Sequence, residues 1–328
     1  MARKITSAGG GVNGSFGLAI FDNASMDRIH AATLDVLANE GIKTNCKEAL
    51  EIYSAGGCEA DKNEGRVRIP ARIVEAAIDS APESILFAAR DPENDFVMEG
   101  SRVHFCNFSK GVNVIDAFTG VYRESRLEDQ KNVAILVDAL SEYDLLDVAV
   151  ETRDVPDAIA NILSYEAMAA NCSKHSGQSA HGRREAEIMI EMAAVIAGGK
   201  EKLRERPICS CVVCPTSPLT ISNETTEPII AYAENGVPCT VLSMVMAGST
   251  APVTLAGTLV VHNAEVLSGI VLGQLTKKGA PNLYGSSSTI LDLRTAAVSV
   301  GCPELAMLGA AVAKLAQYYK IPSYLAGG

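Results

Sequence analysis

The chain has 328 residues, 48% of them hydrophobic and 20% charged, so it can bury a large core and is not globally disordered. Its 28 basic and 39 acidic residues give a net charge of −11, which argues against nucleic acid as the main partner and favours a cationic ligand. The 9 cysteines lack the spacing of a secreted disulfide framework, so we expect reduced thiols and no metal site, including at the cluster of Cys209, Cys211 and Cys214.

The first 125 residues change element type quickly. Ser25 is a good N-cap for a helix that Gly41 closes. Further helices are predicted at 46–54 and 70–79, a strand at 66–69, and short strands joined by turns up to residue 124. We interpret residues 1–125 as a helical and small-β extension. The basic, glycine-rich start lacks the apolar stretch of a signal peptide, so a cytoplasmic location is expected.

From residue 126 onward, strands and amphipathic helices alternate regularly. Strands are predicted at 145–150, 173–176, 207–214, 238–243, 282–287 and 322–327. Helices are predicted at 127–140, 156–170, 184–196, 227–235, 253–277 and 303–319. Apolar strands joined by long helices indicate a parallel sheet that helices cover on its outer face.

This βα alternation fits either a doubly wound sheet or most of a barrel. No GxGxxG turn follows a strand, which weakens the dinucleotide-binding alternative. Because a (β/α)8 barrel closes with eight strands, we predict an α/β fold in which residues 126–328 form the first six strands of a TIM-type barrel, incomplete here. The apolar run 254–275 contains His262, Asn263 and Glu265, so we predict a buried helix and expect no membrane span.

Long irregular stretches then carry a resemblance to a known family. They include VHFCNFSKGVNVIDAFTG from residue 103, VVCPTSPLTISNETTEPII from residue 212 and APNLYGSSSTILDLRTAAVSVGCPELAM from residue 280. These stretches resemble the trimethylamine:corrinoid methyltransferase family over nearly the whole chain. The resemblance implies a TIM-type barrel that moves a methyl group from trimethylamine to the cobalt of a corrinoid, giving dimethylamine in methylamine-dependent methanogenesis. The corrinoid is implied to belong to a cognate partner protein, with no cofactor bound directly, and a homo-oligomer is expected.

The end of the chain resembles a particular point in this family. In the methanogen-type members, an in-frame amber codon is read as pyrrolysine directly after a stretch similar to residues 324–328. We therefore expect Gly328 to precede a pyrrolysine, and we expect these 328 residues alone to be inactive and poorly soluble. Relatives without pyrrolysine act on other quaternary amines such as glycine betaine, and that alternative stays open.

Active sites of such barrels lie at the carboxyl ends of the strands, which selects the candidate catalytic residues. Glu151 follows the first strand, and its carboxylate is a candidate partner for an ammonium. His175 and Gln178, with His181, are expected just after the second strand, where they could tune protonation of the amine. Tyr284 is expected at the end of the fifth strand as a cation–π face.

The remaining candidates follow from the same rule. Tyr324 is the corresponding aromatic residue of the sixth strand. Residues predicted to contact the approaching corrinoid follow the fourth and fifth strands and are Met244, Gly248, Ser286 and Ser287.

Two alternatives remain beside this hypothesis. The first is another barrel enzyme, such as an aldolase-like lyase, which would need a Schiff-base lysine, and Lys174 is the candidate. The second is a chain without catalytic function, either an amber-terminated fragment or a scaffold for the corrinoid partner.

Overall fold

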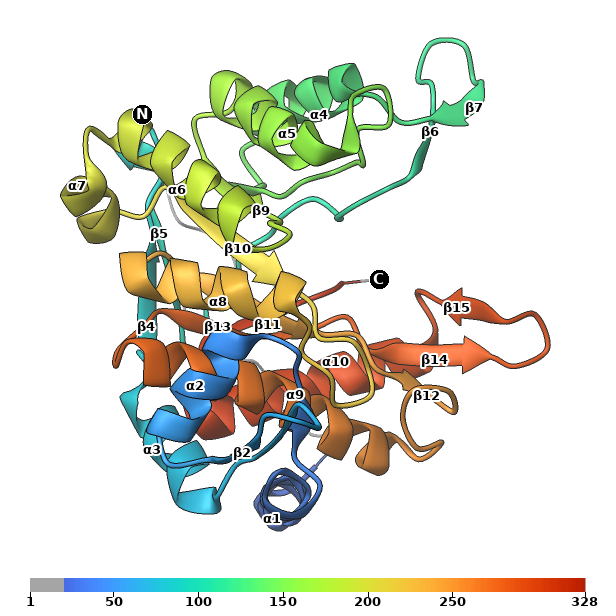
Figure 1. The fold of residues 1–328 in the computed structure, drawn as a ribbon. Coiled ribbons are helices and arrows are strands. Elements are labelled where there is room, and N and C mark those ends of the chain that lie inside the picture. Colours follow the sequence, from blue (N-terminus) through green and yellow to red (C-terminus); the bar gives the residue numbers. More distant parts are fainter. Residues whose placement is uncertain (1–20, 328) are drawn as a thin grey trace. The chain divides into compact units, whose positions relative to one another are not determined.

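The computed structural model describes residues 21–327, and the described chain divides into two compact units (Figure 1). The first unit comprises residues 86–212, and the second joins residues 21–85 to residues 213–327. Residues 86–125 therefore belong to the same unit as the first barrel strands. The predicted boundary at residue 125 stays a prediction.

The first unit contains short strands followed by a regular βα series. Its helices are α4 (Leu127–Ala139), α5 (Asp157–Asn171), α6 (Arg183–Ala197) and α7 (Lys200–Glu205), with a short 3-10 helix at Pro92–Asn94. Its strands are β5 (Phe96–Glu99), β6 (Asn113–Ile115), β7 (Tyr122–Glu124), β8 (Leu145–Leu146), β9 (His175–Gln178) and β10 (Cys209–Val213), and β4 (Ser84–Phe87) leads into it. The hairpin β6–β7, predicted from its turn residues, is confirmed.

Strands β8, β9 and β10 pair in parallel, with Leu146 beside Ser176 and Ser176 beside Cys209. Helices α4 and α5 cover one face of these strands, because Leu146 packs in a buried apolar cluster with Met168 and Val137. Side chains alternate between the faces of a strand, so the residues next to Leu146 and Ser176 point away from these helices. We call that opposite face the interior face.

The second unit contains the longest helix of the described chain. Its helices are α1 (Asn23–Asn39), α2 (Lys47–Ala55), α3 (Ala71–Ser80), α8 (Asn223–Asn235), α9 (Leu255–Thr276) and α10 (Pro303–Tyr319). Its strands are β1 (Ile42–Lys43), β2 (Glu59–Asp61), β3 (Arg66–Arg68), β11 (Cys239–Ser243), β12 (Met246–Ala247), β13 (Asn282–Ser286), β14 (Thr289–Asp292), β15 (Ala297–Ser299) and β16 (Ser323–Leu325). Asp22, rather than the predicted Ser25, caps α1.

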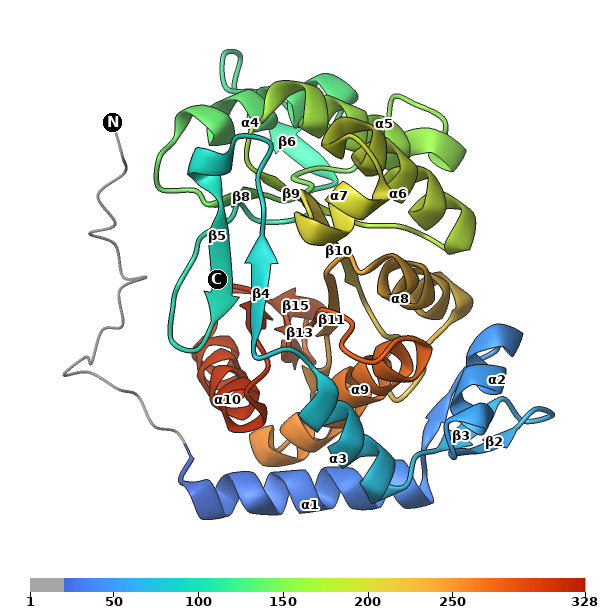
Figure 2. The same cartoon turned by 90° about the vertical axis from the view of Figure 1, so that its left-hand side faces the viewer.

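Helix α9 is the centre of the second unit, and Figure 2 shows α1 running along its outer side. Helices α1, α3 and α8 pack against α9, which in turn lies on β11 and β13. It is long and apolar enough to cross a membrane, but 72% of its apolar window is buried inside the protein. The prediction of a buried helix is confirmed.

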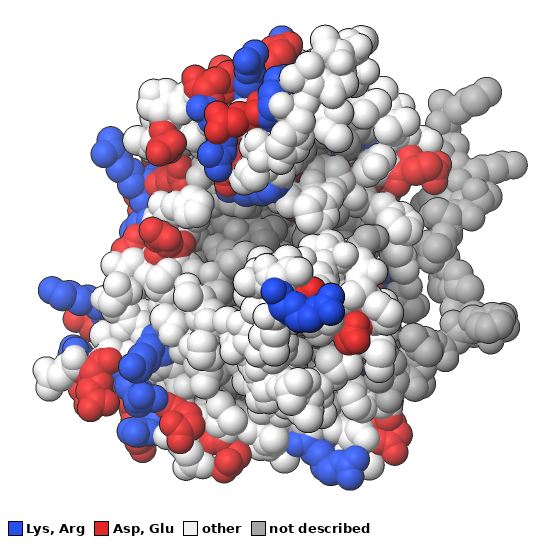
Figure 3. Space-filling view, turned by 90° about the vertical axis from the view of Figure 1, so that its right-hand side faces the viewer, with Lys and Arg blue, Asp and Glu red and all other residues white. Residues whose placement is uncertain are grey.

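Strands β11, β13 and β16 pair in parallel, with Leu242 beside Gly285 and Gly285 beside Tyr324. A second small sheet of β12, β14 and β15, which the sequence did not predict, follows the carboxyl ends of β11 and β13. Leu293, Val298 and Val300 of this hairpin region are exposed. Much of the surface drawn in Figure 3 is uncharged.

The predicted α/β architecture is confirmed. Parallel strands alternate with helices in both units, as in a TIM-type (β/α)8 barrel, and the described residues supply six such strands. Several strands are shorter than predicted: the strand predicted at 145–150 is β8, Leu145–Leu146, and the one predicted at 322–327 is β16. The strand predicted at 173–176 begins two residues later, at His175.

Candidate functional site

Tyr284 lies in the middle of β13 and points into the helix layer, so its predicted position at the strand end is wrong. It is fully buried, and its hydroxyl donates to Asn263 Oδ1 at 2.6 Å. Its ring packs between His262 and Tyr319, with centroid distances of 5.4 and 5.9 Å. Burial raises the pKa of Tyr284 well above its usual value. These neighbours occupy both the ring and the hydroxyl, while its catalytic role stays a prediction.

Tyr324, and not Tyr284, points away from the helices of the second unit. We call the face of β11, β13 and β16 that is opposite α9 the interior face of this unit. Ser323 pairs with Tyr284, and Tyr324 pairs with Gly285, so Tyr324 and Tyr284 point to opposite faces of the sheet. Because Tyr284 reaches α9, Tyr324 lies on the interior face, and it is only half-buried. An added Cβ at Gly285 would come within 2.7 Å of Thr240 Cγ2, so glycine is required for this close packing beside Tyr324.

Serines close the carboxyl ends of β11 and β13. Ser286 is buried and its Oγ accepts the Ser288 amide at 3.2 Å, while the Ser287 amide donates to the Ser243 carbonyl at 3.0 Å. Ala326, just past β16, donates its amide to the Ser286 carbonyl at 2.9 Å. Ser286 and Ser287 therefore tie the ends of three parallel strands together, and their predicted contact with a corrinoid stays a prediction.

Met244 directly follows β11, and Gly248 begins the turn that follows the short strand β12. The Met244 side chain is 44% exposed, which leaves it available to a partner. Gly248 has φ +81°, a left-handed conformation that glycine adopts without strain. A Cβ added to Gly248 would meet only Val253 Cγ2, at 3.9 Å, so its backbone conformation rather than crowding favours glycine at this turn.

Glu265 is a buried carboxylate at the carboxyl end of β11, although it belongs to the outer helix α9. It is fully buried and accepts from Ser243 Oγ at 2.6 Å, Ser217 Oγ at 2.9 Å and the Leu219 amide at 2.9 Å. Burial raises the pKa of Glu265, and these hydrogen bonds lower it, with a net rise. The sequence placed Glu265 in a buried helix and gave no signal for its partners.

A chain of hydrogen bonds joins β13 to the surface of the second unit through Asn263. Asn263 Nδ2 donates to the Tyr319 hydroxyl at 2.8 Å, while Asn263 Oδ1 accepts from Tyr284. The Tyr319 hydroxyl lies 2.9 Å from His30 Nδ1, and His30 Nε2 lies 2.8 Å from Glu75 Oε1. These contacts fix α1, α3, α9, α10 and β13 to one another.

Glu151 is paired with a cation from its own unit. Its Oε1 lies 3.2 Å from Lys110 Nζ, which also donates to Asn161 Oδ1 at 3.3 Å. Asn161 Nδ2 in turn donates to Glu185, whose carboxylate accepts the His181 amide. The carboxylate predicted to meet a substrate ammonium thus already has an ammonium partner, and its catalytic role stays a prediction.

His175 opens β9 and does not follow it, so its predicted position is wrong. It is fully buried, its Nδ1 lies 2.9 Å from the Ala88 carbonyl, and its ring stacks on Phe87 at 4.2 Å. Burial lowers the pKa of His175 to about 4, so the ring is neutral at pH 7. These contacts place it at the amino end of the strand, opposite to the end where barrel enzymes act.

Gln178 is the last residue of β9, so it lies at the carboxyl end of this strand, and it is fully buried. Its side chain hydrogen-bonds Tyr165 of α5, which places it on the helix face of the strand. The prediction located the correct end of the strand. Its role towards an amine stays a prediction.

Asp147 is the carboxylate that the sequence analysis missed. It directly follows Leu146, which packs on the helices, so Asp147 points to the interior face and is 2% exposed. A Cβ added to Gly177 on the neighbouring strand would lie 3.1 Å from Asp147 Cγ, so glycine makes room for this carboxylate. The strand was predicted to continue to residue 150, which hid Asp147 inside it.

Lys174, the candidate Schiff-base lysine of the lyase alternative, has its ammonium group bound to backbone carbonyls. It is 4% exposed, and its Nζ donates to the carbonyls of Val137 and Leu140 at 2.7 and 2.6 Å. These carbonyls belong to the C-terminal turn of α4, a position that stabilises cations. The geometry assigns Lys174 to fold stability. Within residues 21–327, no group of histidine, cysteine and acidic residues could hold a metal ion.

Comparisons with known proteins place this geometry in context. A family profile described as "Trimethylamine methyltransferase (MTTB)" matches residues 6–328. The trimethylamine methyltransferase MttB of Desulfitobacterium hafniense is 47% identical over 326 residues, covering 99% of this chain and 66% of that protein. The MttB of Methanosarcina thermophila is 40% identical, covering 100% of this chain and 69% of its own length. The chain thus spans about two thirds of these relatives.

Two further comparisons bear on substrate and fold. A glycine betaine methyltransferase of Desulfitobacterium hafniense is 35% identical, covering 94% of this chain and 64% of that protein. The crystal structure of the Methanosarcina barkeri monomethylamine methyltransferase MtmB matches with a TM-score of 0.54 at 13% identity. It covers 93% of this chain and 67% of that chain, and this likeness confirms the fold.

Proposed function

The chain belongs to the trimethylamine methyltransferase (MTTB) family, and from that membership we propose a corrinoid-dependent methyl transfer for the full protein. In the proposed reaction, a methyl group leaves trimethylamine and joins the cobalt of a corrinoid that a cognate partner protein carries. Dimethylamine is the other product. The names of two relatives support trimethylamine as the donor. The proposed setting is methylamine-dependent methanogenesis in the cytoplasm.

The observation that carries this proposal from the family to the site is Tyr324 on the interior face. An amine gives up a methyl group readily only when its nitrogen carries positive charge, so the site must hold a cation and exclude water. An aromatic ring over a desolvated cation contributes about 0.5–2 kcal/mol. Tyr324 is half-buried and pairs with Gly285 in the last of the described parallel strands, β16, one residue before that strand ends.

Within the first unit, taken by itself, we propose Asp147 as the carboxylate for a positively charged ligand. It lies on the interior face directly after β8, where Gly177 leaves room for it. The corrinoid supplies the methyl acceptor when its carrier binds. Met244, Gly248, Ser286 and Ser287 are the residues that we propose for the approach of that carrier, because they follow the carboxyl ends of β11 and β13.

The test uses the full protein with its reduced corrinoid partner and either trimethylamine or glycine betaine. We expect trimethylamine to give the absorption spectrum of the methylated corrinoid. We expect Tyr324→Ala to lower kcat/KM by about tenfold and Tyr324→Phe to keep most of it, because phenylalanine retains the ring. Reaction with glycine betaine but not with trimethylamine would contradict the proposed substrate. It would favour glycine betaine as the methyl donor, the second candidate, which the name of the 35% identical relative supports.

We also propose that pyrrolysine follows Gly328 in the full protein. The support is the resemblance of residues 324–328 to the stretch before pyrrolysine in methanogen-type members. Sequencing the coding region tests this: an in-frame amber codon followed by further coding sequence is expected, and a sense codon would contradict it. Expression of residues 1–328 alone tests the fragment alternative, and we expect no methyl transfer from that product.

A further inference from the structure

The loop of residues 214–222, which follows β10, is held from two sides within the second unit. The Leu219 carbonyl accepts the Lys43 amide at 2.8 Å, and the Ile221 amide donates to the Lys43 carbonyl at 2.8 Å. On the other side, Glu265 accepts the Leu219 amide and Ser217 Oγ, both at 2.9 Å. The loop therefore has one fixed edge on β1 and another on α9.

Leu219 is the residue of this loop that needs such support. Its φ is +52°, in the left-handed region that leucine rarely adopts. A residue in this region persists only where its surroundings determine its conformation, and such residues concentrate at functional sites. Both peptide groups of Leu219 are bound, the amide by Glu265 and the carbonyl by Lys43.

Packing alone does not explain a glutamate at position 265, because burying its carboxyl group costs desolvation free energy. It lies in an apolar helix, is fully buried, and an apolar side chain there would avoid the desolvation of a carboxyl group. Its hydrogen bonds reach no residue of the surrounding apolar core. They reach the loop 214–222 and Ser243, the last residue of β11, both at the carboxyl ends of the strands.

We propose that Glu265 is a positioning residue that sets the loop 214–222 and the end of β11 for the reaction. The proposal rests on the proposed function, since it assigns that reaction to these strand ends. Glu265 acts through Ser243 and Leu219 and does not itself need to touch the substrate.

The first measurement is hydrogen exchange of backbone amides in the full protein, and it does not depend on activity. Glu265→Leu removes both carboxylate oxygens and with them all three hydrogen bonds, so we expect the Leu219 and Ile221 amides to exchange at least about tenfold faster. Glu265→Gln keeps an oxygen acceptor for Leu219 and lets the serine hydroxyls reorient, so the loop should stay protected. Gln274→Leu is the matched control, because Gln274 is a buried polar residue in the last turn of the same helix, whereas Glu265 lies in its middle.

The second measurement is methyl transfer by the same variants. A merely structural loss lowers the fraction of folded enzyme and leaves KM unchanged, whereas a misplaced loop changes KM. We expect Glu265→Leu to raise KM for trimethylamine or for the corrinoid protein by at least about fivefold, with Glu265→Gln close to the wild type. Gln274→Leu should lose stability without a change of KM.

The outcomes separate the two proposals. An inactive wild-type protein would overturn the proposed function, and the exchange of Leu219 would still decide whether Glu265 fixes the loop. Unchanged Leu219 exchange in Glu265→Leu would overturn the positioning role. It would also fall if Gln274→Leu raised KM as much as Glu265→Leu does, since the effect would then be general destabilisation.

Discussion

The amino and carboxyl ends of the parallel strands use buried polar side chains for different purposes. At the amino ends, His175 and Gln274 bind backbone groups of neighbouring elements and complete a closed core. At the carboxyl ends, Glu265 binds a loop in the second unit, and Asp147 lies on the interior face of the first unit. Under the proposed function, the same chemistry serves folding at one end and the geometry of a site at the other. In this fold, the position along the strand is a better guide to role than burial.

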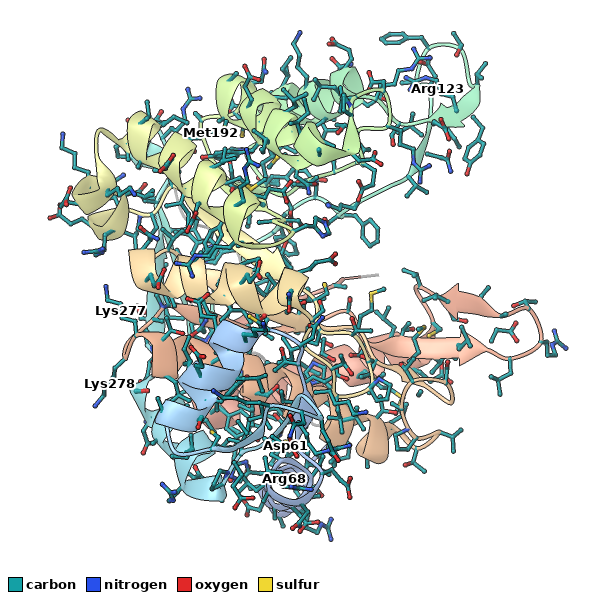
Figure 4. The ribbon with its side chains drawn as sticks, viewed as in Figure 1. Asp61, Arg68, Arg123, Met192, Lys277 and Lys278 are labelled. Atoms are coloured by element: carbon teal, nitrogen blue, oxygen red, sulfur yellow. The ribbon has the colours of Figure 1, made fainter. Side chains whose placement is uncertain are left out.

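The largest effect is expected at the amino end of β13. Gln274 Nε2 donates to the Ala280 carbonyl at 2.7 Å and Asn282 Oδ1 at 3.0 Å, and Gln274 Oε1 accepts from Gly279 and Ser80. Gln274→Leu leaves these groups unsatisfied and should lower the free energy of unfolding by roughly 4 kcal/mol. Urea unfolding measures this free energy. A loss of less than about 1 kcal/mol would contradict the role of buried polar residues at the amino ends in stabilising the fold. Figure 4 shows Lys277 and Lys278 just beyond this end of α9.

The next effect is a loss of stability in acid from two buried histidines. Burial lowers the pKa of His175 and of His262 to about 4 from 6.5, so the unfolded chain binds protons more readily than the folded one. Their stabilisation is complete above pH 6.5 and is lost as the pH falls towards 4, by roughly 3 kcal/mol for each group. His175→Gln should flatten the dependence of unfolding free energy on pH in this window, and an unchanged slope would contradict its burial in the neutral form.

A smaller effect is expected at the carboxyl ends in the first unit. Gly177→Ala places a Cβ 3.1 Å from Asp147 Cγ, so that carboxylate must shift. We expect a loss of about 2 kcal/mol in the free energy of unfolding, and a larger proportional loss in kcat/KM because the site geometry changes. If a variant at an amino end that is equally destabilised lost as much kcat/KM as Gly177→Ala does, the result would argue against a site at Asp147.

The smallest effect is expected for the ion pair of Glu151 and Lys110. Their side chains are 39% and 20% exposed, and such pairs contribute less than about 1 kcal/mol. Glu151→Gln should therefore unfold at nearly the same urea concentration as the wild type. Its methyl transfer tests the catalytic prediction for Glu151 separately, and unchanged activity would contradict that prediction. Arg123, labelled in Figure 4, forms ion pairs with Asp116 and Asp129. A substitution of Arg123 serves as the control for the loss of an ion pair outside the candidate site.

The fold was predictable from the sequence, while the direction of individual side chains was not. Long amphipathic helices between apolar strands fix the class, and α9 was recognised as buried from its polar residues. The strand of His175 reads HSGQ, with no apolar alternation, so its start could not be located and His175 was assigned to the wrong end. For Tyr284, a one-residue difference in register decides between the helix face and the interior face.

The partners of Glu265 lay beyond sequence reasoning for a different reason. Ser217, Leu219 and Ser243 are separated from it by 22 to 48 residues, and no spacing rule links them. They come together because α9 packs on β11 and the loop 214–222 lies against the same part of α9. A glutamate in a buried apolar helix needs hydrogen-bond partners, but the sequence does not say which residues provide them.

The polar side chains in the middle of α9 also affect how the nascent chain is handled before it folds. By length and composition, the 22 residues of α9 are already sufficient to cross a lipid bilayer, and these side chains are the main groups that oppose it. A charged side chain at the centre of such a segment adds about 2.5–3.5 kcal/mol to the free energy of insertion by the translocon. Glu265, with His262 and Asn263 beside it, therefore makes insertion of the unfolded segment into a membrane less favourable, in addition to the contacts that these residues make in the folded protein.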